Sequence, residues 1–140
     1  MACPYFLPQR RVEGVGRAEP ARAPLGAIYA GLCLADAGSS RQPDPEQLFG
    51  ACNFGYGRGV CSHFPQTASA DAVRFSLYEG GGTSTLTYVL EENGSPVSHG
   101  VIHCTAGLRL EPPAVGSLGF VLGNQAKSFL ESYRSWKIKT

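Results

Sequence analysis

Four cysteines in a glycine- and proline-rich N-terminal half constrain this chain more than any other feature. Cys3, Cys33, Cys52 and Cys61 are separated by 29, 18 and 8 residues, and no C-x-x-C pair occurs. This half has few regular apolar segments to offset a backbone entropy of about 1–2 kcal/mol per ordered residue. Small loop-rich units of this kind rely on disulfides or on a bound metal. The four cysteines are therefore candidates for one shared centre.

The beginning of the chain favours a metal over disulfides. Met1-Ala2-Cys3 is followed by prolines and arginines, without the apolar stretch of a secretory signal. No apolar run approaches the ~20 residues needed to span a membrane. We therefore expect a cytoplasmic protein without membrane contact, in which thiols stay reduced. Metal ligation, a reactive thiol or a small buried side chain are then the roles open to each cysteine.

The spacing of the cysteines predicts an iron–sulfur cluster. Structural zinc modules usually present pairs of cysteines two to four residues apart, which this chain lacks. Single cysteines far apart in sequence can each reach one iron of a cluster, and a Cys-Pro step such as Cys3-Pro4 often accompanies such ligands. We expect Cys3, Cys33, Cys52 and Cys61 to bind a [4Fe–4S] cluster. This type is favoured over [2Fe–2S] because its four iron corners match four cysteines that come from separate segments. Zinc on the same thiols is the alternative, and independent buried or reactive thiols are the third.

Several neighbours of the cysteines could shield or tune such a cluster. Aromatic rings would exclude water, and glycines let backbone amides approach the sulfurs. The candidates are Tyr5, Phe6, Phe54, Tyr56 and Phe64, with Gly55, Gly57 and Gly59. His63 is the nearest substitute ligand, although a surface position or a hydrogen bond to a ligand is the commoner role. Cys104 ends a predicted strand outside this half, so we expect a small buried residue and not a ligand.

The second half carries ordinary fold signals. Apolar Val73, Phe75 and Leu77 alternate with polar residues, which predicts a strand. A second predicted strand, 83–90, continues through an Asn93-Gly94 turn into a third, 96–104, which together make an antiparallel meander. After Pro112-Pro113, apolar residues recur at helical spacing from 118 to 136, so we expect an amphipathic helix that covers one face of the meander.

The first half offers two short regular segments. Asp44 followed by Pro45 is a typical helix start, and this helix should end near 53–55, where glycine can adopt the left-handed stop. A short helix or turn is expected over 25–33. The sequence thus predicts an α+β fold in a single domain, 1–140. Its loop-rich cluster-binding half, 1–66, would pack on the antiparallel strands and C-terminal helix of 67–140.

Charge and motifs exclude several other functions. The net charge is +1 and spread along the chain, so nucleic acid is not an expected partner. Four arginines near the beginning of the chain either belong to a solvated loop, or offset the negative charge of a cluster or bind an acidic partner. They are Arg10, Arg11, Arg17 and Arg22. His99 and His103 would lie roughly 13 Å apart on a strand, too far to share one ion. No nucleophile elbow, phosphate loop or paired carboxylates occur, which disfavours an enzyme.

The chain also resembles a group of uncharacterised bacterial four-cysteine proteins. The resemblance rests on Cys3-Pro4-Tyr5-Phe6, on Pro24-Leu25-Gly26 leading to Cys33, and on Cys52-Asn53-Phe54-Gly55-Tyr56 leading to Cys61. It continues through 71–75 and the C-terminal helix, so it covers most of the chain. It implies a self-contained single-domain protein and supplies no activity.

These observations predict a small soluble iron–sulfur protein for electron transfer or redox sensing, working with a redox partner protein. The alternative is a protein-interaction module whose N-terminal half is held together by zinc. A thiol-based redox or metal-transfer enzyme is a third class.

Overall fold

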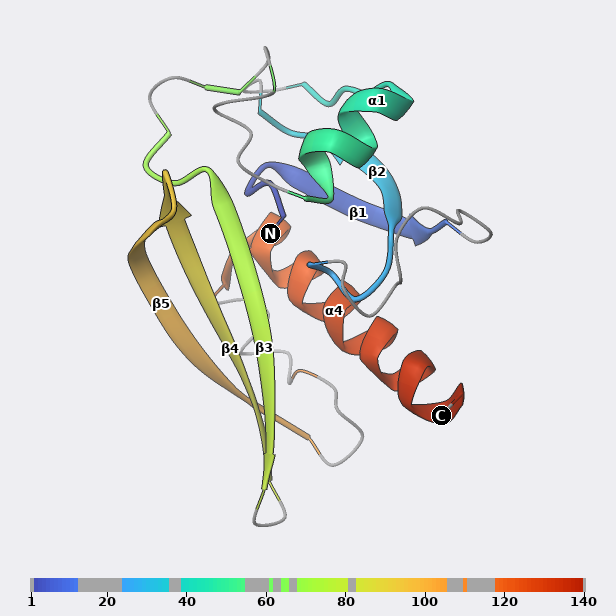
Figure 1. Cartoon of the computed structure of the whole chain (residues 1–140), viewed down its shortest axis with the longest axis vertical. Coiled ribbons are helices and arrows are strands. Elements are labelled where there is room, and N and C mark those ends of the chain that lie inside the picture. Colours follow the sequence, from blue (N-terminus) through green and yellow to red (C-terminus); the bar gives the residue numbers. More distant parts are fainter. Residues whose placement is uncertain are drawn as a thin grey trace.

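The chain folds as two antiparallel sheets with a long helix between them (Figure 1). The computed structural model describes residues 2–12, 24–35, 39–54, 61, 64–65, 68–80, 83–105, 110 and 118–139. Strands β1 (Phe6–Arg11) and β2 (Tyr29–Cys33) form the smaller sheet, and β3 (Ala72–Gly80), β4 (Thr83–Glu92) and β5 (Ser95–Cys104) form the larger one. The helical elements are α1 (Pro45–Gln47), the π-helical turn η2 (Leu48–Cys52) and α4 (Phe120–Lys139). The predicted α+β class is confirmed.

The larger sheet is the predicted meander. Asn93 and Gly94 have φ angles of 50° and 85°, so both central residues of the β4–β5 turn are left-handed, as a two-residue hairpin requires. The turn sets Glu92 opposite Ser95, and one register shift follows between Leu90 and Glu91. Gly80 pairs with Thr83 at the other end of the sheet, while the next two glycines of the predicted turn there, 81–82, lie outside the described residues.

Helix α4 contacts both sheets, and not the meander alone as the sequence suggested. Its Ala126 and Leu130 are buried, and the Phe129 ring lies 5.6 Å from the ring of Phe75 on β3. On its other side the same helix contacts β1, and Figure 1 shows α4 running between the two sheets. The helix therefore joins the first and second halves of the chain by packing against both sheets.

The segment 25–33 is where the local prediction fails. Residues 29–33 form β2, paired with β1 from Phe6↔Cys33 to Arg11↔Tyr29, so a helix there is wrong. Gly26, with φ 79°, makes the turn before it. Pairing between distant segments, which a local pattern cannot report, determines the strand.

The short helix begins as predicted and ends differently. The Asp44 side chain accepts a hydrogen bond of 2.8 Å from the Gln47 backbone N–H, which confirms it as the cap. The last turn widens into η2 and ends at Cys52, with Asn53 in a right-handed conformation (φ −85°). Gly55, the predicted left-handed stop, lies outside the described residues.

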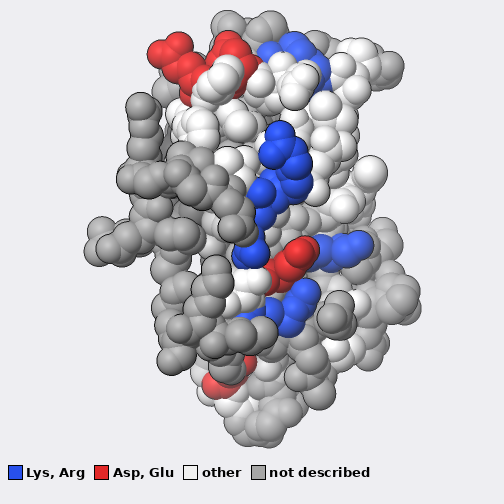
Figure 2. Space-filling view, turned by 90° about the vertical axis from the view of Figure 1, so that its right-hand side faces the viewer, with Lys and Arg blue, Asp and Glu red and all other residues white. Residues whose placement is uncertain are grey.

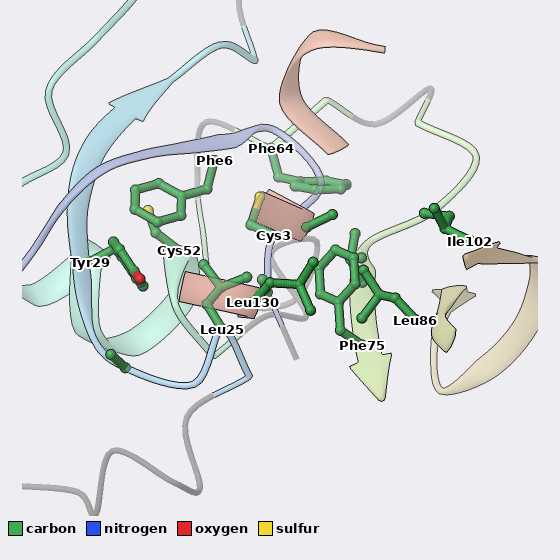
Figure 3. Packing of buried hydrophobic residues seen from close by; sticks show 14 residues of the cluster. Cys3, Phe6, Leu25, Tyr29, Cys52, Phe64, Phe75, Leu86, Ile102 and Leu130 are labelled. Carbon is green, nitrogen blue, oxygen red and sulfur yellow. The ribbon is translucent and has the colours of Figure 1, made fainter. Parts of the chain in front are cut away.

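The N-terminal half buries more large apolar side chains than its sequence suggested. Phe6, Leu25 and Tyr29 belong to the same buried cluster as residues of the meander and α4 (Figure 3). Ala2 is fully buried and pairs with Val73 of β3 through hydrogen bonds of 2.8 and 2.7 Å. The two halves thus share a core. Among the described residues, no helix is long and apolar enough to cross a bilayer.

Replacing Gly26 should destabilise the junction between the β2 turn and α4. A Cβ at this position would lie 2.7 Å from the Cβ of Ser132, and the backbone is left-handed. We expect Gly26→Ala to lower the free energy of unfolding by at least about 1 kcal/mol, measured by urea denaturation. Gly50→Ala is the control, because Gly50 is exposed with nothing near its Cβ position; an equal loss in both variants would contradict this account.

Candidate metal centre

All four candidate cysteines line one pocket. It lies between β1, the end of β2 and η2, and its walls are Cys3, Phe6, Cys33, Ala35, Arg41, Ala51, Cys52, Cys61 and Phe64. Cys3, Cys33 and Cys52 are buried, Cys61 is half-buried, and all four are free thiols. Segments far apart in sequence therefore bring their sulfur atoms to one place, and metal ligation by them stays a prediction.

Backbone hydrogen bonds involve all four cysteines. The Cys3 N–H donates to the Cys52 carbonyl at 3.1 Å, which ties the beginning of the chain to the end of η2. Cys33 and Arg41 exchange two backbone hydrogen bonds, of 2.7 and 3.0 Å, just beyond β2. The Cys61 carbonyl accepts from the Phe64 N–H at 3.2 Å. The thiols are thus held by the fold itself.

Asn53 locks the Cys52 turn against β2. Its side-chain oxygen accepts from the Tyr29 N–H at 2.9 Å, and its amide nitrogen donates to the carbonyls of Tyr29 and Leu48, each also at 2.9 Å. The residue is 1% exposed. Sequence reasoning placed Asn53 only at the end of a helix, and nothing in the local pattern signals this bridging role.

Gln125 of α4 positions the Cys3 turn from the other side. Its side-chain nitrogen donates to the carbonyls of Cys3 and Phe6, both at 2.7 Å, and the residue is fully buried. A buried glutamine on the apolar face of a helix was not singled out from the sequence. A polar residue at a core position of the helical repeat is the one signal that could have found it.

Aromatic rings close part of the pocket. Phe6 and Phe64 line it, and the Tyr5 ring meets the edge of Phe64 at 5.5 Å. Figure 3 shows Phe6 and Phe64 on the same side of the core as Cys3 and Cys52, with Phe75, Leu86 and Ile102 on the other. Of the aromatic residues predicted to shield the site, Phe6 and Phe64 line the pocket and Tyr5 packs against Phe64. Tyr56 and the glycines at 55, 57 and 59 lie outside the described residues.

Burial keeps the thiols of Cys3 and Cys52 protonated when no metal is bound. Burial, opposed by a hydrogen bond from the Tyr5 backbone and aided by the neighbouring cysteines, raises the pKa of Cys3 to about 12. Burial likewise raises the pKa of Cys52 to about 12, with Cys33 and Cys61 adding to the rise and Arg41 opposing it. Such thiols are poor nucleophiles and must lose protons to bind a metal.

Arg41 supplies a positive charge and an unused donor to the pocket wall. One terminal nitrogen of its guanidinium donates to the Gln47 side-chain oxygen at 3.0 Å. Its Nε is buried and has no hydrogen-bond partner among the described residues. Leaving such a donor unpaired costs about 1–3 kcal/mol, so the site favours an additional acceptor near this atom.

The thiols as they stand surround a small space and not a single ion. Among the described residues, no group of three or more His, Cys, Asp or Glu side chains could hold a metal ion. The cavity volume is about 10 Å³, which is about the room that one water molecule needs.

The other predicted candidates lie elsewhere. Cys104 ends β5, pairs with Ser84, and is not on the pocket wall; burial raises the pKa of its thiol. His99 and His103 are exposed on β5, opposite Val89 and Thr85. His63, Arg17 and Arg22 fall outside the described residues.

Basic side chains gather on the side of the molecule where β1 ends. Figure 2 views that side and shows Lys and Arg residues down the middle of the face, with acidic residues at its upper edge, among the basic ones in the middle and near its lower edge. Arg10 and Arg11 are the last residues of β1. Phe6, at the other end of this strand, is its residue on the pocket wall, so Arg10 and Arg11 stand four and five residues along the strand from the pocket.

Comparisons with known proteins give no relative. No family model matches the chain, and neither the curated proteins nor the solved structures contain a match.

Removing the Asn53 side chain should loosen the Cys52 turn. We expect Asn53→Ala to lower the free energy of unfolding by about 1–3 kcal/mol, because buried backbone groups of Tyr29 lose their partners. Asn124→Ala is the matched control, since that amide makes one exposed hydrogen bond within α4. Chemical denaturation of both variants checks this, and a loss no larger for Asn53 than for Asn124 would rule out the bridging role.

Proposed function

We propose that Cys3, Cys33, Cys52 and Cys61 hold an iron–sulfur cluster, [4Fe–4S] in preference to [2Fe–2S], and that the protein transfers electrons or senses redox state. The observation that carries the proposal is the pocket lined by four free thiols from separate segments. When bound, such a cluster supplies one-electron oxidation and reduction at a potential set by burial, hydrogen bonds and net charge.

The spacing of the cysteines along the chain supports a cluster over one ion. Structural zinc sites are usually built from cysteine pairs two to four residues apart, and this chain has no such pair among its four candidates. A cluster lets each thiolate bind its own iron, which suits single cysteines from separate segments. The pocket that these four cysteines line brings the separate segments to one place.

Four cysteine ligands favour electron transfer or sensing over catalysis. With every corner of a [4Fe–4S] cluster bound by a cysteine, no iron is left open to a substrate. The raised pKa values of Cys3 and Cys52 also argue against a thiol-based enzyme, because thiolates are the nucleophiles in such chemistry. The residues around the site bury it, orient the ligands and exclude water.

The redox partner in this proposal is a protein with an acidic surface. Strand β1 ends in Arg10 and Arg11, Figure 2 shows basic residues along one side of the molecule, and the guanidinium fork suits carboxylates. Such an encounter weakens as salt increases, because charges on exposed surfaces are screened.

The second candidate is a zinc-stabilised interaction module. The narrowness of the cavity favours it, because one ion needs less room than a cluster. Four cysteine thiolates also satisfy a structural zinc site. In that case the surface of the protein, and not the metal, carries the function.

Metal analysis separates the two candidates. We expect protein purified without oxygen to be brown, to absorb near about 400 nm, and to contain equal amounts of iron and sulfide. About four of each per chain indicates [4Fe–4S], and about two of each indicates [2Fe–2S]. A colourless protein with one zinc per chain would refute the cluster and favour the module.

Substitution of each ligand tests the residue assignment. Cys3→Ser, Cys33→Ser, Cys52→Ser and Cys61→Ser should each lose at least half of the bound iron and lower hydrogen-exchange protection mainly before residue 64, since metal binding is coupled to folding. Cys104→Ser is the control and should keep full iron content, because Cys104 is not on the pocket wall. Full loading and unchanged stability in all four variants would show that the cluster is bound elsewhere.

A further inference from the structure

We propose that Arg41 is the charge partner of this centre: its buried Nε–H donates a hydrogen bond to a sulfur of the bound iron–sulfur cluster, and its positive charge raises the reduction potential. This inference rests on the proposed function and extends it by naming the residue that sets the potential. No cysteine spacing or aromatic pattern points to this arginine.

The backbone of Arg41 is fixed to one of the ligands. Cys33 and Arg41 face each other in an antiparallel bridge, with hydrogen bonds in both directions of 2.7 and 3.0 Å. Cys33 is also the last residue of β2, paired with Phe6 of β1. This bridge fixes the backbone of Arg41 directly opposite that of Cys33, and both residues line the pocket.

The side chain is held in one orientation. One terminal nitrogen donates to the Gln47 side-chain oxygen at 3.0 Å, and the Gln47 backbone is itself capped by Asp44 at 2.8 Å. This anchor leaves Nε inside the protein, on a residue of the pocket wall, without a partner among the described residues. A buried donor of this kind calls for an acceptor, and the sulfur atoms of a bound cluster are acceptors at this position.

The charge of the guanidinium favours the reduced state. Four thiolates make the occupied site anionic, and each added electron makes it more negative. A nearby cation therefore stabilises the reduced cluster more than the oxidised one, most strongly where burial removes the screening by water. Arg41 already opposes the rise in the Cys52 pKa for the same reason, since it favours negative charge on that sulfur.

The test compares the midpoint potentials of four loaded proteins, measured by anaerobic redox titration followed by visible absorbance. They are the unchanged chain, Arg41→Gln, Arg41→Lys and Arg10→Gln. We expect Arg41→Gln to disfavour reduction about tenfold, a fall of about 59 mV for one electron, and Arg41→Lys to lie between it and the unchanged chain. Arg10→Gln removes the same charge from an exposed position and should shift the potential by less than half as much.

Each outcome decides one question. An unchanged chain without iron and sulfide refutes the proposed function itself, and this inference with it. A loaded chain whose potential is the same in Arg41→Gln overturns the role of Arg41 alone. Arg41→Gln could also fail to bind the cluster. In that case, cluster binding by Arg41→Lys with a potential near that of the unchanged chain supports the role of Arg41 as charge partner. If neither variant binds the cluster, Arg41 has a packing role and the inference is overturned.

Discussion

The structure depends on the burial of the first few residues between three elements. Ala2 pairs with Val73 of β3, the Cys3 N–H donates to the end of η2, and the Cys3 carbonyl accepts from Gln125 of α4. Ala2 and Cys3 are buried, so these hydrogen bonds form where water does not compete and where an unpaired group is costly. The position of the first ligand is therefore a property of the whole fold, because the meander, the short helix and the long helix meet there.

Features encoded locally could be predicted from the sequence. The alternation of Val73, Phe75 and Leu77, the Asn93-Gly94 turn and the Asp44 cap each depend on neighbouring residues, and the structure has all three. The 25–33 segment was not predictable in the same way, since its pairing with β1 decides its conformation. Gln125 and Asn53 were missed because their partners lie 122 and 24 residues away, and a helix or turn pattern contains no signal for an amide that bonds so far along the chain.

In the candidate site, too, some residues could be predicted from the sequence and others could not. Its cysteines could be selected by type and spacing, because thiols in a reduced chain have few roles. Arg41 could not, because the arginines nearest the first cysteine, Arg10 and Arg11, look at least as suitable. Only the backbone bridge to Cys33 and the unpartnered Nε distinguish it. Chemical type thus selects candidate ligands from a sequence, whereas a candidate for tuning the site can be named only from the folded chain.

The shared core changes what a metal at this site has to do. The sequence argument required a metal because the N-terminal half lacked apolar side chains, yet Phe6, Leu25 and Tyr29 are buried against α4 and the meander. Tyr29 also bonds to Ser128 of α4 through its hydroxyl at 2.9 Å. A half anchored in this way needs a purely structural ion less than a free loop would. The proposed redox role of the four thiols that line the pocket therefore does not depend on the argument that this half needs a metal in order to fold.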